Sequence, residues 1–251
     1  MFVASLHMYD WPELREHTDK FWLGFQRHAG LNIELDRITP FDDAWRNPNL
    51  IFSQTCGYPF THEFNGLLNY VATPHYICAG CYNATYSSFV FAREPKKIES
   101  FRGKTVAINS MDSMSGMLAF KLVIAPFVQK GEFFDRKIIT GSHLNSLKAV
   151  REGIADVCAI DAVCVALAEK YRPQELEGLE IIAQSPMAPN LPYVTRARDP
   201  EHLRTALEKT FADPDLKIAR EALLMCGFSN IGAGAYDRIT KLEKNLPYFN
   251  L

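Results

Sequence analysis

Residues 105–117 read Thr105-Val106-Ala107-Ile108-Asn109-Ser110-Met111-Asp112-Ser113-Met114-Ser115-Gly116-Met117. A short apolar run opens the stretch, a polar turn follows, and a second apolar segment begins near residue 114. The run 105–109 predicts a strand, and the segment 114–124 predicts a helix. A strand that leads directly into a helix is the repeating unit of α/β proteins.

The same alternation extends in both directions from this stretch, so the sequence predicts an α/β fold without internal repeats. Further strands are expected at residues 2–8, 32–38, 50–54, 68–72, 76–81, 84–92, 137–140, 157–160 and 179–183. Further helices are expected from an Asp10 cap to Ala29-Gly30 and at residues 144–151, 162–171, 202–211 and 216–225.

Two segments interrupt the alternation, at residues 84–92 and 185–193, and we interpret both as crossovers between two α/β lobes. The first lobe is expected to be discontinuous, with residues 1–84 and 190–251, and the second to hold residues 85–189. Ligands of open α/β sheets bind beyond the carboxyl ends of the strands. The predicted ligand site therefore lies in the cleft between the lobes.

The turn before residue 114 has the chemistry of an anion site. Backbone N–H groups and the helix dipole favour negative charge at a helix start. Ser113 and Ser115 add hydroxyl donors, and Gly116 allows close approach of the backbone. A plain serine N-cap explains the motif equally well when it is taken alone.

A second turn repeats the arrangement, because Thr140-Gly141-Ser142-His143 also follows a strand and precedes a helix. Ser142 can cap that helix, and Thr140 and His143 can each donate a hydrogen bond. Successive strand–helix units open on the same edge of a sheet. We therefore expect the two helix starts to converge, although His143 alone is also compatible with an ordinary surface histidine.

Asp161 stands where the strand 157–160 turns into the helix 162–171, and its simplest role is that of an N-cap. A carboxylate beside an anion is costly unless the ligand carries a proton or an ammonium group. We hypothesise that Asp161 selects a ligand that donates a hydrogen bond, which favours hydrogen phosphate, phosphite or an aminophosphonate over sulfate. Tyr9 and Thr55 end strands of the first lobe and are weaker candidates for its wall of the cleft.

Composition excludes several classes of function. The net charge is −2 at pH 7 without clustered basic residues, which argues against nucleic-acid binding. No apolar run is long enough to span a bilayer, and the N-terminal residues lack the pattern of a signal peptide. The chain as given is thus expected to be cytoplasmic, or periplasmic if a leader was removed. We expect a monomer without a cofactor.

The six cysteines lack the density of a disulfide scaffold. Cys78 and Cys81 form a C-x-x-C, but a structural zinc site would require a second pair. Thioredoxin-like chemistry expects this motif at a helix start, whereas here it stands at a predicted strand end.

Several segments, in order along the chain, resemble the phosphonate-binding (PhnD-like) family of periplasmic binding proteins. They are Gln54-Thr55-Cys56-Gly57-Tyr58-Pro59, Phe101-Arg102-Gly103-Lys104, Ser113-Met114-Ser115-Gly116, Thr140-Gly141-Ser142-His143 with Ser146, residues 153–161 and Ala188-Pro189-Asn190-Leu191-Pro192. The resemblance implies a type II periplasmic-binding fold, a small oxyanion as ligand and an ABC permease as membrane partner. It also implies an anion site lined by Thr55, Ser113, Ser115, Gly116, Met117, Ser142, His143 and Asp161.

Two alternatives remain at this point. An enzyme on the same fold could use Cys56 and His143 as a nucleophile–base pair on a small heterocyclic substrate, although the sequence offers no third residue to orient the base. A cytoplasmic ligand sensor would also fit a chain without a leader. The main prediction is a binding protein that closes on its ligand and is not an enzyme.

Overall fold

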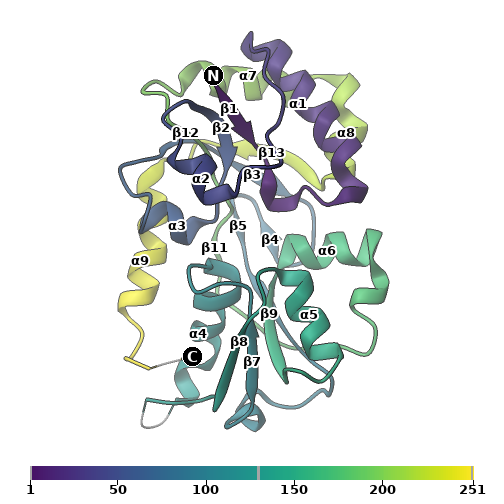
Figure 1. Cartoon of the computed structure of the whole chain (residues 1–251), viewed down its shortest axis with the longest axis vertical. Coiled ribbons are helices and arrows are strands. Elements are labelled where there is room, and N and C mark those ends of the chain that lie inside the picture. Colours follow the sequence, from purple (N-terminus) through teal and green to yellow (C-terminus); the bar gives the residue numbers. More distant parts are fainter. Residues whose placement is uncertain (1, 129–130, 250) are drawn as a thin grey trace. The chain divides into compact units, whose positions relative to one another are not determined.

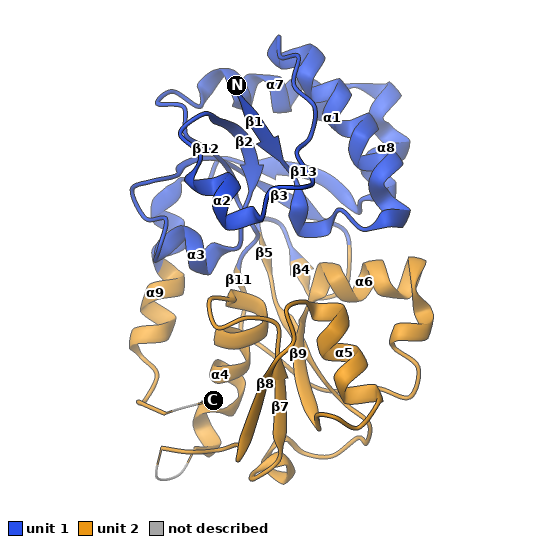
Figure 2. Cartoon of the chain, in the orientation of Figure 1, with its two compact units in different colours: residues 1–77, 82–84, 189–237 blue, residues 78–81, 85–188, 238–251 orange. Residues whose placement is uncertain are grey.

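The computed structural model describes residues 2–128, 131–249 and 251. These residues divide into two compact units, coloured separately in Figure 2. Unit 1 holds residues 1–77, 82–84 and 189–237, and unit 2 holds residues 78–81, 85–188 and 238–251. Short strands lie where the chain passes between the units, namely β4 (Cys81–Tyr82), β5 (Thr85–Tyr86) and β11 (Ala188–Pro189).

Unit 1 contains a mixed sheet with the strand order β1-β2-β12-β3-β13 (Figure 1). Its strands are β1 (Val3–Ser5), β2 (Leu50–Gln54), β12 (Tyr193–Thr195), β3 (Asn69–Tyr76) and β13 (Met225–Ser229). The pair β1–β2 is parallel, whereas β12 runs antiparallel to both β2 and β3. A late strand is therefore inserted between two early ones, which makes unit 1 discontinuous in sequence.

Helices and aromatic side chains build the core of unit 1. Its helices are α1 (Arg15–Ala29), α2 (Phe41–Arg46), α3 (Gly57–Thr61), α7 (Glu201–Ala212) and α8 (Lys217–Ala222). Helix α1 packs against α7 and α8. Beneath it, the ring of Phe52 lies 4.4 Å from Phe25 and 5.0 Å from Tyr193, measured between centroids. Burial of such apolar rings is the main favourable term in folding.

Unit 2 contains a second mixed sheet, with the order β10-β6-β9-β7-β8. Its strands are β6 (Ser88–Ala92), β7 (Thr105–Ile108), β8 (Arg136–Ile139), β9 (Val157–Asp161) and β10 (Glu180–Gln184). The strand β7 runs parallel to both β8 and β9, so their carboxyl ends share one edge of the sheet. The helices of unit 2 are α4 (Ala119–Ile124), α5 (His143–Arg151), α6 (Ala162–Tyr171) and α9 (Asp237–Lys244), of which α9 begins one residue before the unit boundary.

The α/β architecture predicted from the sequence is confirmed, and so are most of its strand–helix units, but several elements differ. The expected strand 32–38 is reduced to a single bridge between Leu35 and Ala4. The segments 68–72 and 76–81 are not two strands, because β3 runs unbroken from Asn69 to Tyr76. The expected first strand 2–8 ends at Ser5, and a 3-10 turn covers residues 7–9.

Asp10 is not the cap of the first helix, which was an incorrect prediction. The helix α1 begins at Arg15 after a 3-10 turn. The Asp10 carboxylate instead contacts Arg37, whose guanidinium also donates to Asp19 at 2.7 Å. A charge-assisted hydrogen bond to arginine is a stronger use of this carboxylate than a cap.

The C-terminal residues also differ from the sequence analysis, which grouped residues 238–251 with the first lobe. The division into compact units places them in unit 2. There the ammonium of Lys121 lies 5.4 Å from the centre of the Phe249 ring, a cation–π contact.

No described helix is long and apolar enough to cross a membrane.

Candidate functional site

Ser113 ends the turn after β7 and caps the helical segment that follows. Its backbone is extended, and its Oγ accepts a hydrogen bond from the Gly116 N–H at 2.9 Å. The helix begins at Met114 as expected, but residues 114–118 form a π-helical turn before α4. Such π-helical turns are rare in proteins, and those that occur are often found at functional sites.

The serine-rich turn and the second predicted turn meet within unit 2. Ser115 Oγ lies 2.9 Å from His143 Nε2, so a hydrogen bond joins the start of the π-helical turn to the first residue of α5. Ser113 and Ser115 are each only 4% exposed. The predicted convergence of these two helix starts is confirmed, because β7 and β8 are parallel neighbours.

Hydrogen bonds within the second turn hold it in shape. Ser142 caps α5 and accepts from the Asn145 N–H at 3.2 Å, as expected from its position. The Thr140 hydroxyl contacts the carbonyl of Ile108 and lies 2.6 Å from Ser146 Oγ. Thr140 therefore fixes the turn, and its role as a ligand-binding residue stays a prediction.

The close packing of Gly116 is a feature that only glycine permits here. A Cβ at this position would lie 1.8 Å from Asn109 Oδ1. Asn109 Oδ1 is buried and accepts no hydrogen bond from the described residues. Asn109 was not among the residues predicted from the sequence to line the site, although its place directly after a predicted strand was an available signal. Met117 is buried one residue further on.

Asp161 is the N-cap of α6, as its position predicted. Its Oδ1 accepts hydrogen bonds from the N–H groups of Val163 at 2.7 Å and Cys164 at 3.1 Å. The side chain is 2% exposed. A carboxylate therefore caps the N-terminus of α6, whereas serine hydroxyls cap the helical segments that begin at Met114 and His143.

Burial keeps His143 neutral near pH 7. It lowers the pKa of His143 to about 4, and the nearby Ala159 carbonyl opposes this shift only in part. A neutral imidazole has one nitrogen that donates and one that accepts. The Ser115–His143 pair is therefore an uncharged hydrogen-bonding unit.

This depressed pKa predicts a loss of stability in acid. The unfolded chain binds a proton at His143 near pH 6.5, whereas the folded chain resists it until about pH 4. The stabilisation is complete above pH 6.5 and is lost as the pH falls towards 4, by roughly 3 kcal/mol. Urea unfolding across this range measures it.

A His143→Gln variant is the matched control for this effect. It should show a flatter fall in the free energy of unfolding, because it lacks His143, while the half-buried His7 and His75 contribute equally in both proteins. Parallel curves for the two proteins would contradict the assignment to His143.

In unit 1, Tyr9 and Thr55 follow β1 and β2. Thr55 is fully buried, its N–H donates to the Pro192 carbonyl at 3.1 Å, and its hydroxyl contacts the Cys56 carbonyl. The Tyr9 ring packs edge-on against Tyr76 with centroids 5.6 Å apart. Both residues were predicted as ligand contacts, and these roles stay predictions.

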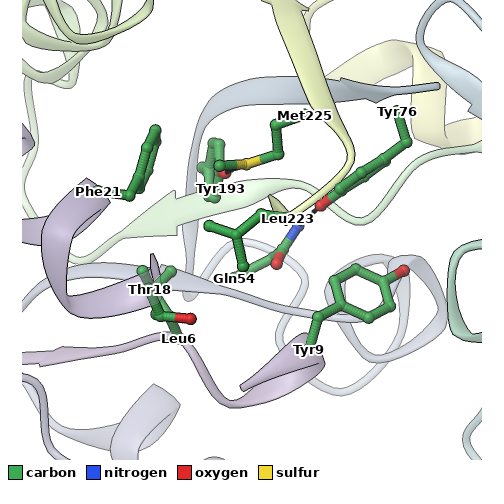
Figure 3. A pocket seen from close by; sticks show the side chains of 9 residues that line it. All are labelled: Leu6, Tyr9, Thr18, Phe21, Gln54, Tyr76, Tyr193, Leu223 and Met225. Carbon is green, nitrogen blue, oxygen red and sulfur yellow. Dashed lines mark hydrogen bonds between the residues drawn. The ribbon is translucent and has the colours of Figure 1, made fainter. Parts of the chain in front are cut away.

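Tyr9 also lines a cavity of about 40 Å³ inside unit 1. Figure 3 shows it among the side chains of Leu6, Tyr9, Thr18, Phe21, Gln54, Tyr76, Tyr193, Leu223 and Met225. Its lining is uncharged and mainly apolar, and the Gln54 amide donates to the Tyr76 hydroxyl at 3.0 Å. This cavity could not be predicted from the sequence, because its lining comes from segments far apart in the chain.

Comparison with known proteins places the architecture in a known fold. PhnD1 from Prochlorococcus marinus in complex with methylphosphonate superimposes with a TM-score of 0.76 at 12% identity over 97% of each chain. A binding protein component of an ABC phosphonate transporter from Pseudomonas aeruginosa gives 0.71 at 15% identity, over 97% of this chain and 96% of that one. XAC2383 from Xanthomonas citri, bound to ATP, gives 0.69 at 17% identity, over 97% and 95%.

The predicted type II periplasmic-binding fold is therefore confirmed. A search of curated proteins finds no significant match. The model of one protein family matches residues 50–230, and its description is "ABC transporter, phosphonate, periplasmic substrate-binding protein". That match spans most of the chain and includes the helix starts capped by Ser113 and Ser142. The chain belongs to the phosphonate-binding family of periplasmic substrate-binding proteins of ABC transporters.

Proposed function

We propose that this protein captures a small phosphorus oxyanion, namely a phosphonate, phosphite or phosphate, for an ABC-type importer. The observation that carries the proposal is the hydrogen bond between Ser115 and His143, which brings the starts of two helical segments together in unit 2. Family membership supports the same conclusion, as does the methylphosphonate bound to the similar PhnD1.

The electrostatics of these groups suit an anion that must later be released. Hydroxyl groups, helix N-termini and a neutral imidazole supply partial positive charge without a fixed cation. Ser113, Ser115 and Ser142 present their hydroxyls on adjacent turns, and burial keeps His143 uncharged. Hydrogen bonds of this kind bind an oxyanion through geometry, and a ligand that leaves a buried donor or acceptor unpaired is rejected.

Two acceptors in unit 2 favour a ligand that carries a proton. Asp161 is buried as a carboxylate cap, and Asn109 Oδ1 lacks a donor among the described residues. A protonated phosphorus oxyanion can donate a hydrogen bond, whereas sulfate at neutral pH cannot. We assign selection against sulfate to these acceptors, with Asp161 as the charged one.

Asp161→Asn tests this selection without removing the helix cap, because asparagine caps helices as well as aspartate does. The variant is expected to keep its fold and to lose discrimination between phosphate and sulfate by about tenfold or more. Calorimetric titration with both anions measures the ratio of affinities. An unchanged ratio would show that Asp161 is only a cap.

The function itself is tested by calorimetric titration of ligand-stripped protein with phosphate, phosphite, methylphosphonate, 2-aminoethylphosphonate and sulfate. Tight binding of one phosphorus oxyanion with rejection of sulfate is the expected result, and the ranking identifies the organic substituent. Absence of binding to every phosphorus compound would overturn the proposal. Copurification with a membrane permease would test the proposed transport partner.

The enzyme alternative is not retained, because the family consists of substrate-binding proteins. The chemistry of His143 agrees with this conclusion. A general base works best with a pKa near the operating pH, whereas burial lowers the pKa of His143 to about 4.

A further inference from the structure

Cys78 and Cys81 lie at opposite ends of one tight turn, and neither belongs to a disulfide in this structure. The Cys81 N–H donates to the Cys78 carbonyl at 3.2 Å, and Gly80 has a positive φ of 82°. A β-turn of this kind holds its end Cα atoms less than about 7 Å apart. Disulfides usually join Cα atoms about 4.4–6.8 Å apart, a separation that the two ends of such a turn can adopt.

The two sulfur atoms already face each other. Cys78 Sγ and Cys81 Sγ are 3.3 Å apart and share a hydrogen bond. A disulfide requires them to approach to about 2.05 Å, which side-chain rotation within the turn can supply. Both residues are half-buried, so that a small reagent has access to them.

Packing fixes the turn in this shape. A Cβ on Gly80 would lie 2.8 Å from the Cβ of Ala162 and 2.9 Å from the Phe89 ring. The Gly80 carbonyl also accepts a hydrogen bond from the Ser87 N–H at 2.8 Å. The thiols are therefore held near each other in the folded protein, which raises their effective concentration for one another.

The other cysteines of unit 2 are poor competitors. Burial raises the pKa of Cys158 and of Cys164, and for Cys164 the neighbouring Asp161 adds to the shift. Thiol–disulfide exchange needs a thiolate, so these two react slowly. In unit 1, Cys226 is exposed.

We propose that Cys78 and Cys81 form a reversible redox site, which closes to an intramolecular disulfide on reaction with a low-molecular-weight disulfide such as oxidised glutathione. One cysteine thiolate attacks the glutathione disulfide, forms a mixed disulfide and releases one glutathione thiolate. The second cysteine thiolate then attacks the mixed disulfide, forms the Sγ–Sγ bond and releases the second glutathione. The two cysteines are oxidised, the glutathione disulfide is reduced, and the two thiol protons pass to the released glutathiones.

The place of this turn in the chain gives the site a structural consequence. The chain leaves unit 1 between Ile77 and Cys78 and returns to it between Cys81 and Tyr82. A disulfide here would close a small covalent loop at this crossing of the chain. Oxidation would therefore restrict the backbone of one segment that connects the two units.

The test uses the full-length protein, reduced and then equilibrated in buffers of defined glutathione redox ratio. After quenching with N-ethylmaleimide, peptide mass spectrometry reports the state of every cysteine. We expect Cys78 and Cys81 to lose their thiols together and to form one disulfide. Half-oxidation should need at least about tenfold less oxidised glutathione than half-modification of the exposed Cys226.

Three variants make the outcome specific. In Cys78→Ser and Cys81→Ser, the remaining cysteine should hold one glutathione as a stable mixed disulfide, because the resolving thiol is gone. Cys226→Ser should leave closure unchanged. The proposal is overturned if Cys78 and Cys81 remain thiols, and are alkylated by N-ethylmaleimide, in buffers in which glutathione has modified Cys226. It is also overturned if Cys78 pairs with Cys164 in place of Cys81.

Discussion

The double variant Ser113→Ala/Ser115→Ala is expected to bind the proposed phosphorus oxyanion roughly 100- to 10,000-fold more weakly than the wild type. Each hydroxyl is proposed to donate to a charged ligand, and such bonds contribute about 1.5–3 kcal/mol apiece. Loss of Ser115 also removes the partner of His143 Nε2, which lies 2.9 Å away. Calorimetric titration measures the loss, and the single variants divide it between the two serines.

Ser100→Ala is the matched control for this variant. Ser100 is an exposed serine of the same unit, in the 3-10 turn Ile98–Phe101, and its removal should leave the affinity unchanged. Removing the Ser113 cap costs about 1 kcal/mol of stability, so circular dichroism and thermal melts must show that the double variant remains folded. If the double variant is folded and keeps the wild-type affinity, these two hydroxyls do not contact the ligand.

Phe52→Ala is expected to lower the free energy of unfolding by about 3–5 kcal/mol. Phe52 is fully buried, and its ring lies 4.4 Å from Phe25, 5.0 Å from Tyr193 and 5.9 Å from Trp22, measured between centroids. The truncation leaves a cavity that these rigid aromatic neighbours cannot fill. Urea unfolding monitored by tryptophan fluorescence measures the change.

Phe2→Ala makes the same chemical change at a side chain that is 58% exposed. Its expected cost is below about 0.5 kcal/mol, since surface truncations rarely exceed that value. A loss of less than about 1 kcal/mol in Phe52→Ala would show that the aromatic cluster does not carry the stability of unit 1.

Helix starts in unit 2 could be predicted from the sequence because their signals are local. Ser142 and Asp161 cap α5 and α6 through backbone N–H groups only two or three residues away. The predicted helix 162–171 has the same bounds as α6, and the prediction 144–151 begins one residue after α5 does. A cap depends on the residue type and its immediate neighbours, which the sequence contains directly.

Strand pairing was predicted less well, because its determinants are distant in sequence. β12 and β13 were both missed, although each pairs along β3. β12 has only three residues, and nothing within it specifies its place between β2 and β3. The opposite error occurred at residues 32–38, whose strand-like pattern found no partner beyond the bridge from Leu35 to Ala4.

The candidate site likewise has features that could be predicted from the sequence and contacts that could not. The sequence alone determined that serine hydroxyls and helix starts follow β7 and β8, since strand, turn and cap signals stand side by side in it. Tertiary structure decided that Ser115 meets His143, that Asn109 packs against Gly116, and that distant segments enclose the cavity beside Tyr9. These contacts depend on which strands become neighbours, and that choice results from burial of the whole core and not from any local pattern.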